Sequence, residues 1–293
     1  MPLYTVKPNL TGISATNMVV DTDSKRILGG FGSNYHRSWV FPLYTPSGMT
    51  VVREFPFDHP FHNGVFIGQN PVRVGGRVAN YWALPVTRSA DDHIMVNIGR
   101  MDPVGEIETI IDDSVTFSLR STWLDENGDP MLDEKRVVRF QSMDDATICD
   151  VTSMKTAAYG AVECSQTKFG TIGMRVEERL LPALGGEVIS SLDGEIRRGT
   201  ADEVANHMAC DAIAYENSLA GTTFGVCMMI RDNTASTERR GPWFIRDYGM
   251  AMFNATQDDA VHIPDGETWT ASLRVVAYDG ALTPERITAY SQM

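Results

Sequence analysis

The segment "SVTFSLRSTWLD", residues 114–125, alternates apolar and polar side chains with a period of two. Val115, Phe117 and Leu119 share one face of it. This period is typical of a β-strand with one buried face, because an amphipathic helix repeats its apolar residues every three to four positions. A turn built on Asn-Gly ("DENGDP") follows, and "KRVVRFQSM", residues 135–143, predicts the partner strand. The first expected element is therefore a β-hairpin.

Similar strand patterns continue toward the C-terminus and are separated by turn residues at short spacing. They are "ATICDVTSMKTA" (146–157), "TTFGVCMMIRD" (222–232), "GMAMFNA" (249–255) and "TWTASLRVVAYDG" (268–280). Many short strands divided by frequent turns are typical of sandwiches and barrels. The sequence therefore predicts a mainly β fold, a large antiparallel β-sandwich of the supersandwich type with a few short helices.

Two helices are expected, and both are short. "TADEVANHMA" has Thr200 as N-cap and Glu203 three residues later, which is a capping box that predicts a helix from about Ala201. "TPERITAYSQM" places a proline at the first helical position and predicts a helix over 284–292. The chain shows no internal repeat and no long linker, so a single domain over 1–293 is the simplest organisation.

Composition and charge limit the partners that we expect. The 293 residues carry a formal net charge of −13, which disfavours nucleic acid and anionic membrane surfaces as partners. The chain lacks signal-peptide features and any apolar run near the roughly 18 residues of a membrane span. The four cysteines form no CxxC pair, so we expect reduced, mostly buried thiols in a cytoplasmic protein. The oligomeric state stays open, a homo-oligomer included.

The segment "FPFDHPFHNG" carries two of the six histidines, His59 and His62. Pro56 and Pro60 each remove a backbone donor, so the segment is expected to form a shaped loop before the strand "VFIG". Imidazole suits proton transfer near neutral pH and metal ligation. The two histidines therefore predict an acid–base pair or two ligands of a metal site, although two imidazoles that only order a turn would fit as well.

Two further segments gather polar side chains. "SQTKFGTIGMRVEERL" offers Lys168 and Arg175, which could hold a carboxylate or polarise a carbonyl group, or form only surface ion pairs. "GPWFIRDYGMAMFNA" places a tryptophan, an arginine, an aspartate and a tyrosine within six residues. Trp and Tyr are common platforms for sugars and rings, but a structural core cluster fits this segment equally. These four residues are Trp243, Arg246, Asp247 and Tyr248.

No cofactor is expected from local motifs. The Gly75-Gly76 pair lacks the strand–GxGxxG–helix context of a nucleotide site, and the chain has no GxSxG elbow. A divalent metal is the alternative, and it would recruit His59 and His62 with a distant carboxylate or His207.

Taken together, three stretches resemble one known family. "DHPFHNG" is similar to a DHPHHRG motif, "QTKFGTIGMRV" to a second motif, and "WFIRDYG" with "GETWTASLRVVAYDG" to a third. The chain thereby resembles the PmoA-like family, a bacterial domain of largely unassigned function, from about residue 41 to residue 280. The resemblance implies a mainly β, sandwich-like fold and an association with carbohydrate catabolism.

The resemblance also implies site residues, with departures. His59 and His62 match motif histidines, whereas Phe61 stands where a third histidine is expected and Asn63 where an arginine is expected. Tyr278 replaces a final motif histidine, and these changes imply a more apolar substrate than a typical member takes. The remaining positions that match the motifs are Lys168, Arg175, Arg246, Asp247, Tyr248 and Gly249.

The first functional hypothesis is a catabolic hydrolase or lyase that acts on a small, oxygen-rich substrate derived from a sugar or an aromatic plant compound. Its expected catalytic residues are His59, His62, Lys168 and Tyr248, and its expected substrate-binding residues are Phe61, Asn63, Arg175, Trp243, Arg246 and Asp247. The alternatives are a non-catalytic β-sandwich that binds a carbohydrate or another small ligand, and a structural role. The enzyme hypothesis requires His59, His62, Lys168, Arg175 and Tyr248 to line one concave pocket.

Overall fold

The computed structural model describes residues 3–11, 14–85, 95–236 and 239–293. Its strands form two large sheets and one small one. The first sheet has the order β1 (Tyr4–Thr11), β2 (Ser14–Asp21), β3 (Ile27–Ser33), β4 (Ser38–Leu43), β5 (Val65–Gln69), β13 (Gly170–Arg175), β19 (Met250–Phe253), β18 (Trp243–Ile245). The second has the order β15 (Glu195–Gly199), β14 (Glu187–Leu192), β16 (Ala212–Leu219), β17 (Thr222–Asn233), β21 (Thr268–Asp279), β11 (Ala146–Thr156), β10 (Pro130–Ser142), β9 (Val115–Leu124), β8 (Arg100–Ile111). The small sheet has the order β20 (Val261–Ile263), β12 (Val162–Cys164), β6 (Val72–Val74), β7 (Arg77–Ala79).

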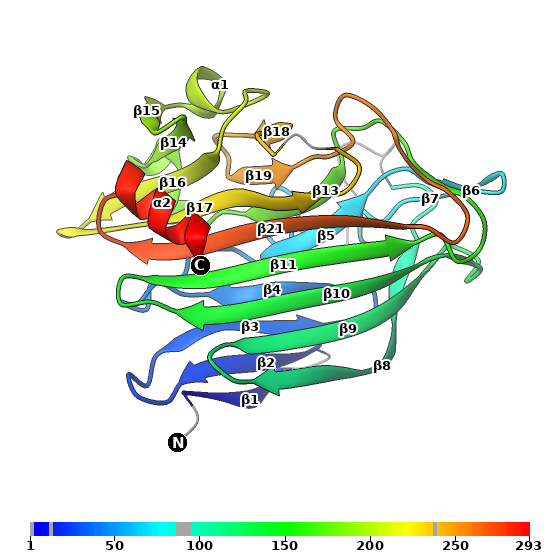
Figure 1. Cartoon of the computed structure of the whole chain (residues 1–293), viewed down its shortest axis with the longest axis horizontal. Helices are drawn as coiled ribbons and strands as arrows, with labels where there is room; N and C mark the ends of the chain where they lie inside the picture. Colours follow the sequence, from blue (N-terminus) through cyan, green and yellow to red (C-terminus); the bar gives the residue numbers. More distant parts are fainter. Residues whose placement is uncertain (1–2, 12–13, 86–94, 237–238) are drawn as a thin grey trace.

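The two large sheets lie face to face, with the second in front of the first in Figure 1. Neighbouring strands in both sheets run antiparallel. The hairpin expected from the sequence is β9 and β10, and Val115, Phe117 and Leu119 are buried as the alternation predicts. One apolar cluster contains residues from all three sheets, because the inward faces pack against each other. The prediction of an antiparallel β-sandwich is confirmed.

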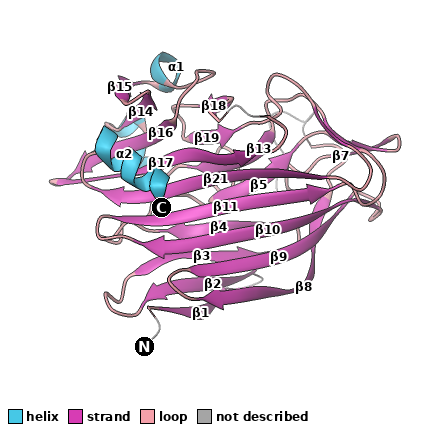
Figure 2. Ribbon diagram, in the orientation of Figure 1, coloured by secondary structure: helices cyan, strands magenta, loops and turns pink. Residues whose placement is uncertain are grey.

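Both predicted helices are present. Helix α1 (Ala201–Val204) begins after Thr200, whose capping box with Glu203 is formed. Helix α2 (Pro284–Gln292) lies on the outer face of the second sheet in Figure 2, where Arg274 of β21 donates to the Tyr290 carbonyl oxygen. Two single 3-10 turns, Glu178–Leu180 and Pro182–Leu184, are the other helical elements of the described ranges. No helix in the described residues combines the length and apolarity needed to cross a bilayer.

The first sheet is unusual in carrying apolar residues on both faces of its last five strands. One row crosses β4, β5, β13, β19 and β18 through Trp39, Phe66, Gly173, Met252 and Phe244. Because side chains alternate along a strand, this row points away from the sandwich core. It belongs to a separate apolar cluster, here called the outer cluster, with the members Trp39, Phe61, Phe66, Trp82, Leu84, Phe244, Met250 and Met252. So apolar a face must be shielded from water. The segment 54–63, here called the histidine loop, covers part of it.

Candidate functional site

The segment from Glu54 to Asn63 folds over the outer face of the first sheet as two successive turns. The His59 amide donates to the Pro56 carbonyl oxygen at 3.2 Å, and the His62 amide donates to the His59 carbonyl oxygen at 2.9 Å. A single bridge between Glu54 and Asn63 closes the base of the loop. The predicted shaped loop is confirmed, and its turns direct both imidazoles to the same side.

Gly64 fixes this loop to the sheet. Its φ of 50° lies in the left-handed region that favours glycine, and a Cβ there would overlap the Val40 carbonyl oxygen. The Gly64 carbonyl oxygen accepts the Arg175 amide at 2.9 Å. The close approach of Gly64 to β4 therefore sets where the histidines lie relative to β13.

Four nearly parallel rings run from the surface into the outer cluster. The Tyr248 and His59 centroids lie 5.3 Å apart with planes 7° apart, and the His59 and His62 centroids lie 4.9 Å apart with planes 1° apart. The His62 and Phe66 centroids follow at 5.6 Å and 18°. We call these four residues the ring ladder. Phe61 packs edge-on against both imidazoles, which explains its burial.

A guanidinium group covers each end of the ring ladder. The Arg175 Cζ atom lies 4.9 Å from the Tyr248 centroid, and the Arg37 Cζ atom lies 4.6 Å from the Phe66 centroid. Cations over aromatic faces are attracted by the ring quadrupole, most strongly where water is excluded. The ladder is therefore a packed, electrostatically stabilised stack.

Asp58 connects the exposed histidine to Arg175. Both Asp58 carboxylate oxygens accept from Arg175 Nη2, at 2.6 and 2.7 Å, and Asp58 Oδ2 lies 2.8 Å from His59 Nδ1. Burial raises the pKa of the Asp58 carboxyl, but the hydrogen bonds from Arg175 and His59 outweigh it, so this pKa is lowered. An ionised Asp58 can only accept, so the proton on neutral His59 lies at Nδ1 and Nε2 is left free.

His62 is buried, unlike His59. Neither of its ring nitrogens has a hydrogen-bond partner in the described part of the chain. Burial, and the positive charges of His59, Arg175 and Arg37, lower the pKa of His62 well below its ordinary value. His62 therefore stays neutral at pH 7 and has no exposed surface from which to exchange protons with a substrate, so its geometry does not support the predicted role of a second acid–base group.

His62 gives a prediction about stability and pH. The unfolded chain takes up a proton on His62 below about pH 6.5 and the folded chain does not, so His62 lowers the free energy of unfolding as the pH falls. Replacing His62 by phenylalanine removes this loss. Urea denaturation between pH 7.5 and pH 5 is expected to show the variant gaining on the wild type by about 1.4 kcal/mol per pH unit below pH 6. Parallel stability profiles for the two proteins would contradict the assignment.

Arg37 and Asn63 lie behind the ladder. Arg37 donates to the Asn63 side-chain oxygen and to the carbonyl oxygens of Phe61 and Trp82. None of these acceptors is charged, and burial, helped by the positive charge of Arg136, lowers the pKa of Arg37 to about 9. No local pattern points to Arg37, which lies 26 positions from Asn63. Asp58, by contrast, directly precedes His59 in the sequence, and this adjacency could have identified it as a site residue.

Tyr248 lies in the tight turn between β18 and β19, where the Gly249 amide donates to the Arg246 carbonyl oxygen at 2.8 Å. Burial of the phenol raises the pKa of Tyr248, although Arg175 and Arg246 oppose the shift. The side chain is nevertheless 38% exposed. Tyr248 therefore stays protonated at neutral pH and can donate a hydrogen bond at the surface.

The other candidates in the Tyr248 segment have structural roles. Trp243 is 0% exposed, lies in the sandwich core and donates from Nε1 to the Cys210 carbonyl oxygen, so the expectation that it stacks on a substrate is wrong. Asp247 Oδ1 accepts the Ala201 amide at 2.7 Å and so holds the first turn of α1. Neither side chain is one of the stacked rings of the ladder.

Arg246 and Lys168 lie at the margins of the site. Arg246 pairs with Asp202 at 3.2 Å and lies over Phe244, with Cζ 4.3 Å from the ring centroid. Lys168 is exposed, and its Nζ atom lies 5.2 Å from the centroid of Phe169, which packs on Trp82 of the outer cluster. Both predicted roles stay predictions, and neither cation is part of the ladder.

The metal alternative finds no third ligand. The described residues contain no group of three His, Cys, Asp or Glu side chains that could hold a metal ion. The ring centroids of His207 and Phe244 lie 6.2 Å apart, and His59 Nδ1 is hydrogen-bonded to the Asp58 carboxylate.

The expectation that these residues line one concave pocket stays a prediction. Five hollows of about 340–460 Å³ in the described surface are lined by residues outside the ladder. The structure brings His59, His62 and Tyr248 together in the ring ladder with Arg175 over the Tyr248 ring, and Lys168 contacts Phe169 instead.

Residues 32–292 match a family described as "Family of unknown function (DUF6807)". The chain belongs to this family. The matched range includes Arg37, the histidine loop, Arg175 and Tyr248, so the whole candidate site lies within the DUF6807 domain. The expected membership of the PmoA-like family is wrong, and the inference of a more apolar substrate from Phe61, Asn63 and Tyr278 falls with it. No curated protein matches this DUF6807 chain.

Solved structures similar to this DUF6807 chain are distant. A galactose mutarotase-like protein from Clostridium acetobutylicum is 9% identical with a TM-score of 0.41, and 95% of this chain and 99% of that chain are covered. A galactose mutarotase-like protein from Lactobacillus casei is 8% identical with a TM-score of 0.39, covering 94% and 100%. A putative aldose 1-epimerase from Escherichia coli K12 is 11% identical with a TM-score of 0.33, covering 95% and 100%. Similarity at this level supports no inference about activity.

Proposed function

We propose that this protein is an acid–base enzyme, a hydrolase or a lyase, that acts on a small, oxygen-rich substrate at the exposed end of the ring ladder. The observation that carries the proposal is the pairing of His59 Nδ1 with Asp58 at 2.8 Å, with Asp58 itself held by the buried Arg175. A carboxylate that fixes one imidazole nitrogen orients the other toward a substrate, which is the arrangement that general-base histidines use.

The ladder supports proton transfer by holding the His59 ring in place. Stacking between Tyr248 and His62 restricts the ring plane, and Asp58 restricts its rotation within that plane. A base held in one orientation loses little entropy when the transition state forms. His59 would remove a proton through Nε2 and stabilise its own positive charge through Asp58, and Tyr248 would donate a hydrogen bond to a substrate oxygen.

The surface beside the pair suits a ring-shaped substrate. Phe57 is 100% exposed on the histidine loop, and Phe55, two positions earlier, is also exposed. Exposed aromatic rings bind the apolar faces of sugars and of aromatic compounds, while polar groups at their edges bind the hydroxyl groups. These rings support a sugar-derived or aromatic plant-derived substrate class.

The same exposed rings favour a second candidate function, a non-catalytic ligand-binding protein. Such a protein would use Phe55, Phe57 and Tyr248 as a contact surface, and the Asp58–His59 pair would only order the loop. The two functions can be separated by experiment, because only the enzyme would convert its bound ligand into a product.

Proton NMR of the purified protein with a panel of sugars, sugar acids and aromatic glycosides separates the two functions. Saturation transfer from the protein reports binding, and new resonances report conversion. The enzyme proposal predicts that a bound compound is converted. A hydrolase would cleave a bond with water, whose elements end on the two products, and a lyase would break a bond by elimination, which leaves a double bond and releases the leaving group. Binding without conversion of every bound compound would favour the binding protein instead.

A further inference from the structure

A hollow of about 450 Å³ opens on the outer face of the second sheet, the sheet that lies in front in Figure 1. Strands β9, β10 and β11 contribute to it, and its lining includes Arg120, Thr122, Asp133, Lys135, Thr156 and Tyr159. Its volume is within the range of roughly 300–1,000 Å³ that small-molecule sites occupy.

The hollow and the ring ladder lie on opposite sides of the sandwich. Leu119 and Trp123, at the alternate positions of β9, are packed in the sandwich core, so Arg120 and Thr122 point outward from the second sheet. The ladder lies on the outer face of the first sheet, where Phe66 belongs to the outer cluster. Both sheets therefore separate the hollow from the site of the proposed function.

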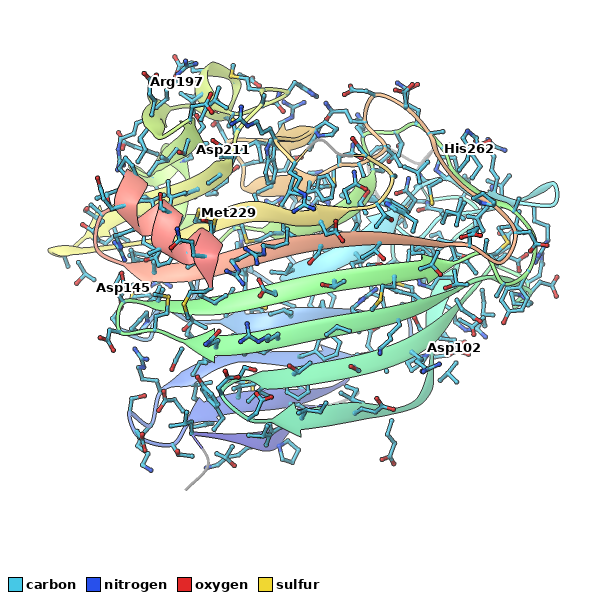
Figure 3. All side chains as sticks on the ribbon, viewed as in Figure 1. Asp102, Asp145, Arg197, Asp211, Met229 and His262 are labelled. Carbon is cyan, nitrogen blue, oxygen red and sulfur yellow. The ribbon has the colours of Figure 1, made fainter. Side chains whose placement is uncertain are left out.

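Two cations line one side of the hollow. Arg120 and Lys135 are directly opposite each other on β9 and β10, a spacing of about 4.5–5.5 Å between Cβ atoms at which like charges repel. Both side chains are exposed, and neither makes a hydrogen bond or an ion pair with the described residues. Asp102, labelled in Figure 3, lies opposite Thr122 on the β8 side and pairs with Arg100 at 3.8 Å instead. The whole chain carries −13, yet positive charge is concentrated here.

An oriented carboxylate lies beside these cations. Asp133 Oδ1 accepts from the Thr122 hydroxyl group at 2.8 Å and from the Tyr159 hydroxyl group at 3.2 Å. Both bonds go to the same oxygen, and no described side chain donates to Oδ2. Oδ2 can therefore accept from a hydroxyl group of a ligand. Tyr159 is 41% exposed and offers the kind of aromatic face on which sugar rings pack.

We propose that this hollow binds an anionic sugar, which is a sugar acid or a sugar phosphate. Arg120 and Lys135 bind the anionic group, and Asp133 Oδ2 accepts from a sugar hydroxyl group. An uncharged sugar would leave the two cations without a counter-ion, and a bare anion would leave Oδ2 unused, so the lining fits a ligand that carries both groups. The proposal does not depend on the activity of His59.

Calorimetric titration with matched sugars tests the proposal. One set is D-glucose, D-glucuronate and D-glucose 6-phosphate, the second is the corresponding D-galactose set, and inorganic phosphate is the bare anion. We expect at least one anionic sugar to bind about 10-fold or more tightly than both its uncharged parent and inorganic phosphate. Arg120→Gln and Lys135→Gln are each expected to abolish this preference and to keep the urea midpoint of the wild type, because both side chains are exposed. The arm that binds distinguishes a sugar acid from a sugar phosphate.

Arg139→Gln is the matched control. Arg139 lies on the same strand and face as Lys135, four residues or about 14 Å along β10, and does not line the hollow. Its replacement removes the same charge and is expected to keep the preference, as is His59→Asn. Three results would each overturn the proposal: no binding of any anionic sugar at about 50 mM, binding of inorganic phosphate as tight as that of the anionic sugars, or a preference that survives in Arg120→Gln and Lys135→Gln. Loss of the preference in Arg139→Gln to the same extent would also overturn it, because the general charge of the face would then explain the binding.

Discussion

Replacing His59 by asparagine is expected to lower kcat for the converted substrate by about 10³-fold, within the roughly 10²–10⁴-fold range of general acid–base catalysis. Asparagine can still donate to Asp58 from a nitrogen near the former Nδ1, so the hydrogen bond that orders the loop is kept. What is lost is Nε2, the nitrogen left free for the substrate. The urea midpoint of the variant is expected to stay close to that of the wild type, because His59 is partly exposed.

His262→Asn is the matched control for this experiment. His262 is an exposed histidine of β20, and Figure 3 shows it at the end of the molecule formed by the small sheet. Its replacement is expected to leave kcat unchanged. If His59→Asn turned the substrate over as fast as His262→Asn, His59 would not be the proton-transfer group and the loop would have only a structural role.

Replacing Gly64 by alanine is expected to produce the largest loss of stability, about 4 kcal/mol or more. Two costs add at this position. The left-handed φ of 50° is strained for alanine, and the new methyl group would overlap the backbone of Val40 in the neighbouring strand. Since backbone cannot move aside as a side chain can, the loop would have to leave the sheet. Chemical denaturation gives the free energy of unfolding, and loss of folded protein on expression would be the extreme form of the same result.

Gly48→Ala separates the two costs. Gly48 also has a positive φ, 85°, but a Cβ there meets nothing within 4 Å. Its replacement is expected to cost only about 1–2 kcal/mol, the strain of the left-handed conformation alone. Similar losses for the two variants would show that Gly64 is not pressed against β4 and that the position of the histidine loop has another cause.

Much of the fold was predictable because it depends on local patterns. The alternation in residues 114–125 fixed both the strand and its buried face, and the Asn-Gly turn fixed the hairpin. The capping box at Thr200 and the proline at position 284 marked the helix starts correctly, because these signals act within one turn of chain. The apolar outer face of the first sheet was not predicted, since both sides of a strand can be apolar only when something else in the fold covers the second side.

The site was predictable in part for the same reason. His59, His62, Arg175 and Tyr248 do converge, and the prolines correctly indicated a shaped loop. Arg37 was missed because only the pairing of β4 with β5 brings it behind the loop.

The prediction of Trp243 as a site residue was wrong because successive side chains of a short strand face opposite sides of the sheet. The side chain of Phe244, one position later, faces the outer cluster, whereas Trp243 faces the sandwich core. Three residues of strand do not reveal which face is which without the neighbouring strands.

The central claim is that Asp58 holds the His59 proton at Nδ1 and leaves Nε2 for the substrate. Long-range proton–nitrogen NMR spectra of the histidine rings, assigned with His59→Asn and His62→Phe, report this directly without any knowledge of the substrate. The structure predicts the Nδ1-protonated tautomer for neutral His59 and its loss in Asp58→Asn, while His62 stays neutral at pH values where an ordinary imidazole is protonated, because burial holds its pKa well below the ordinary value. A neutral His59 protonated at Nε2, with Nδ1 bare, would contradict the account.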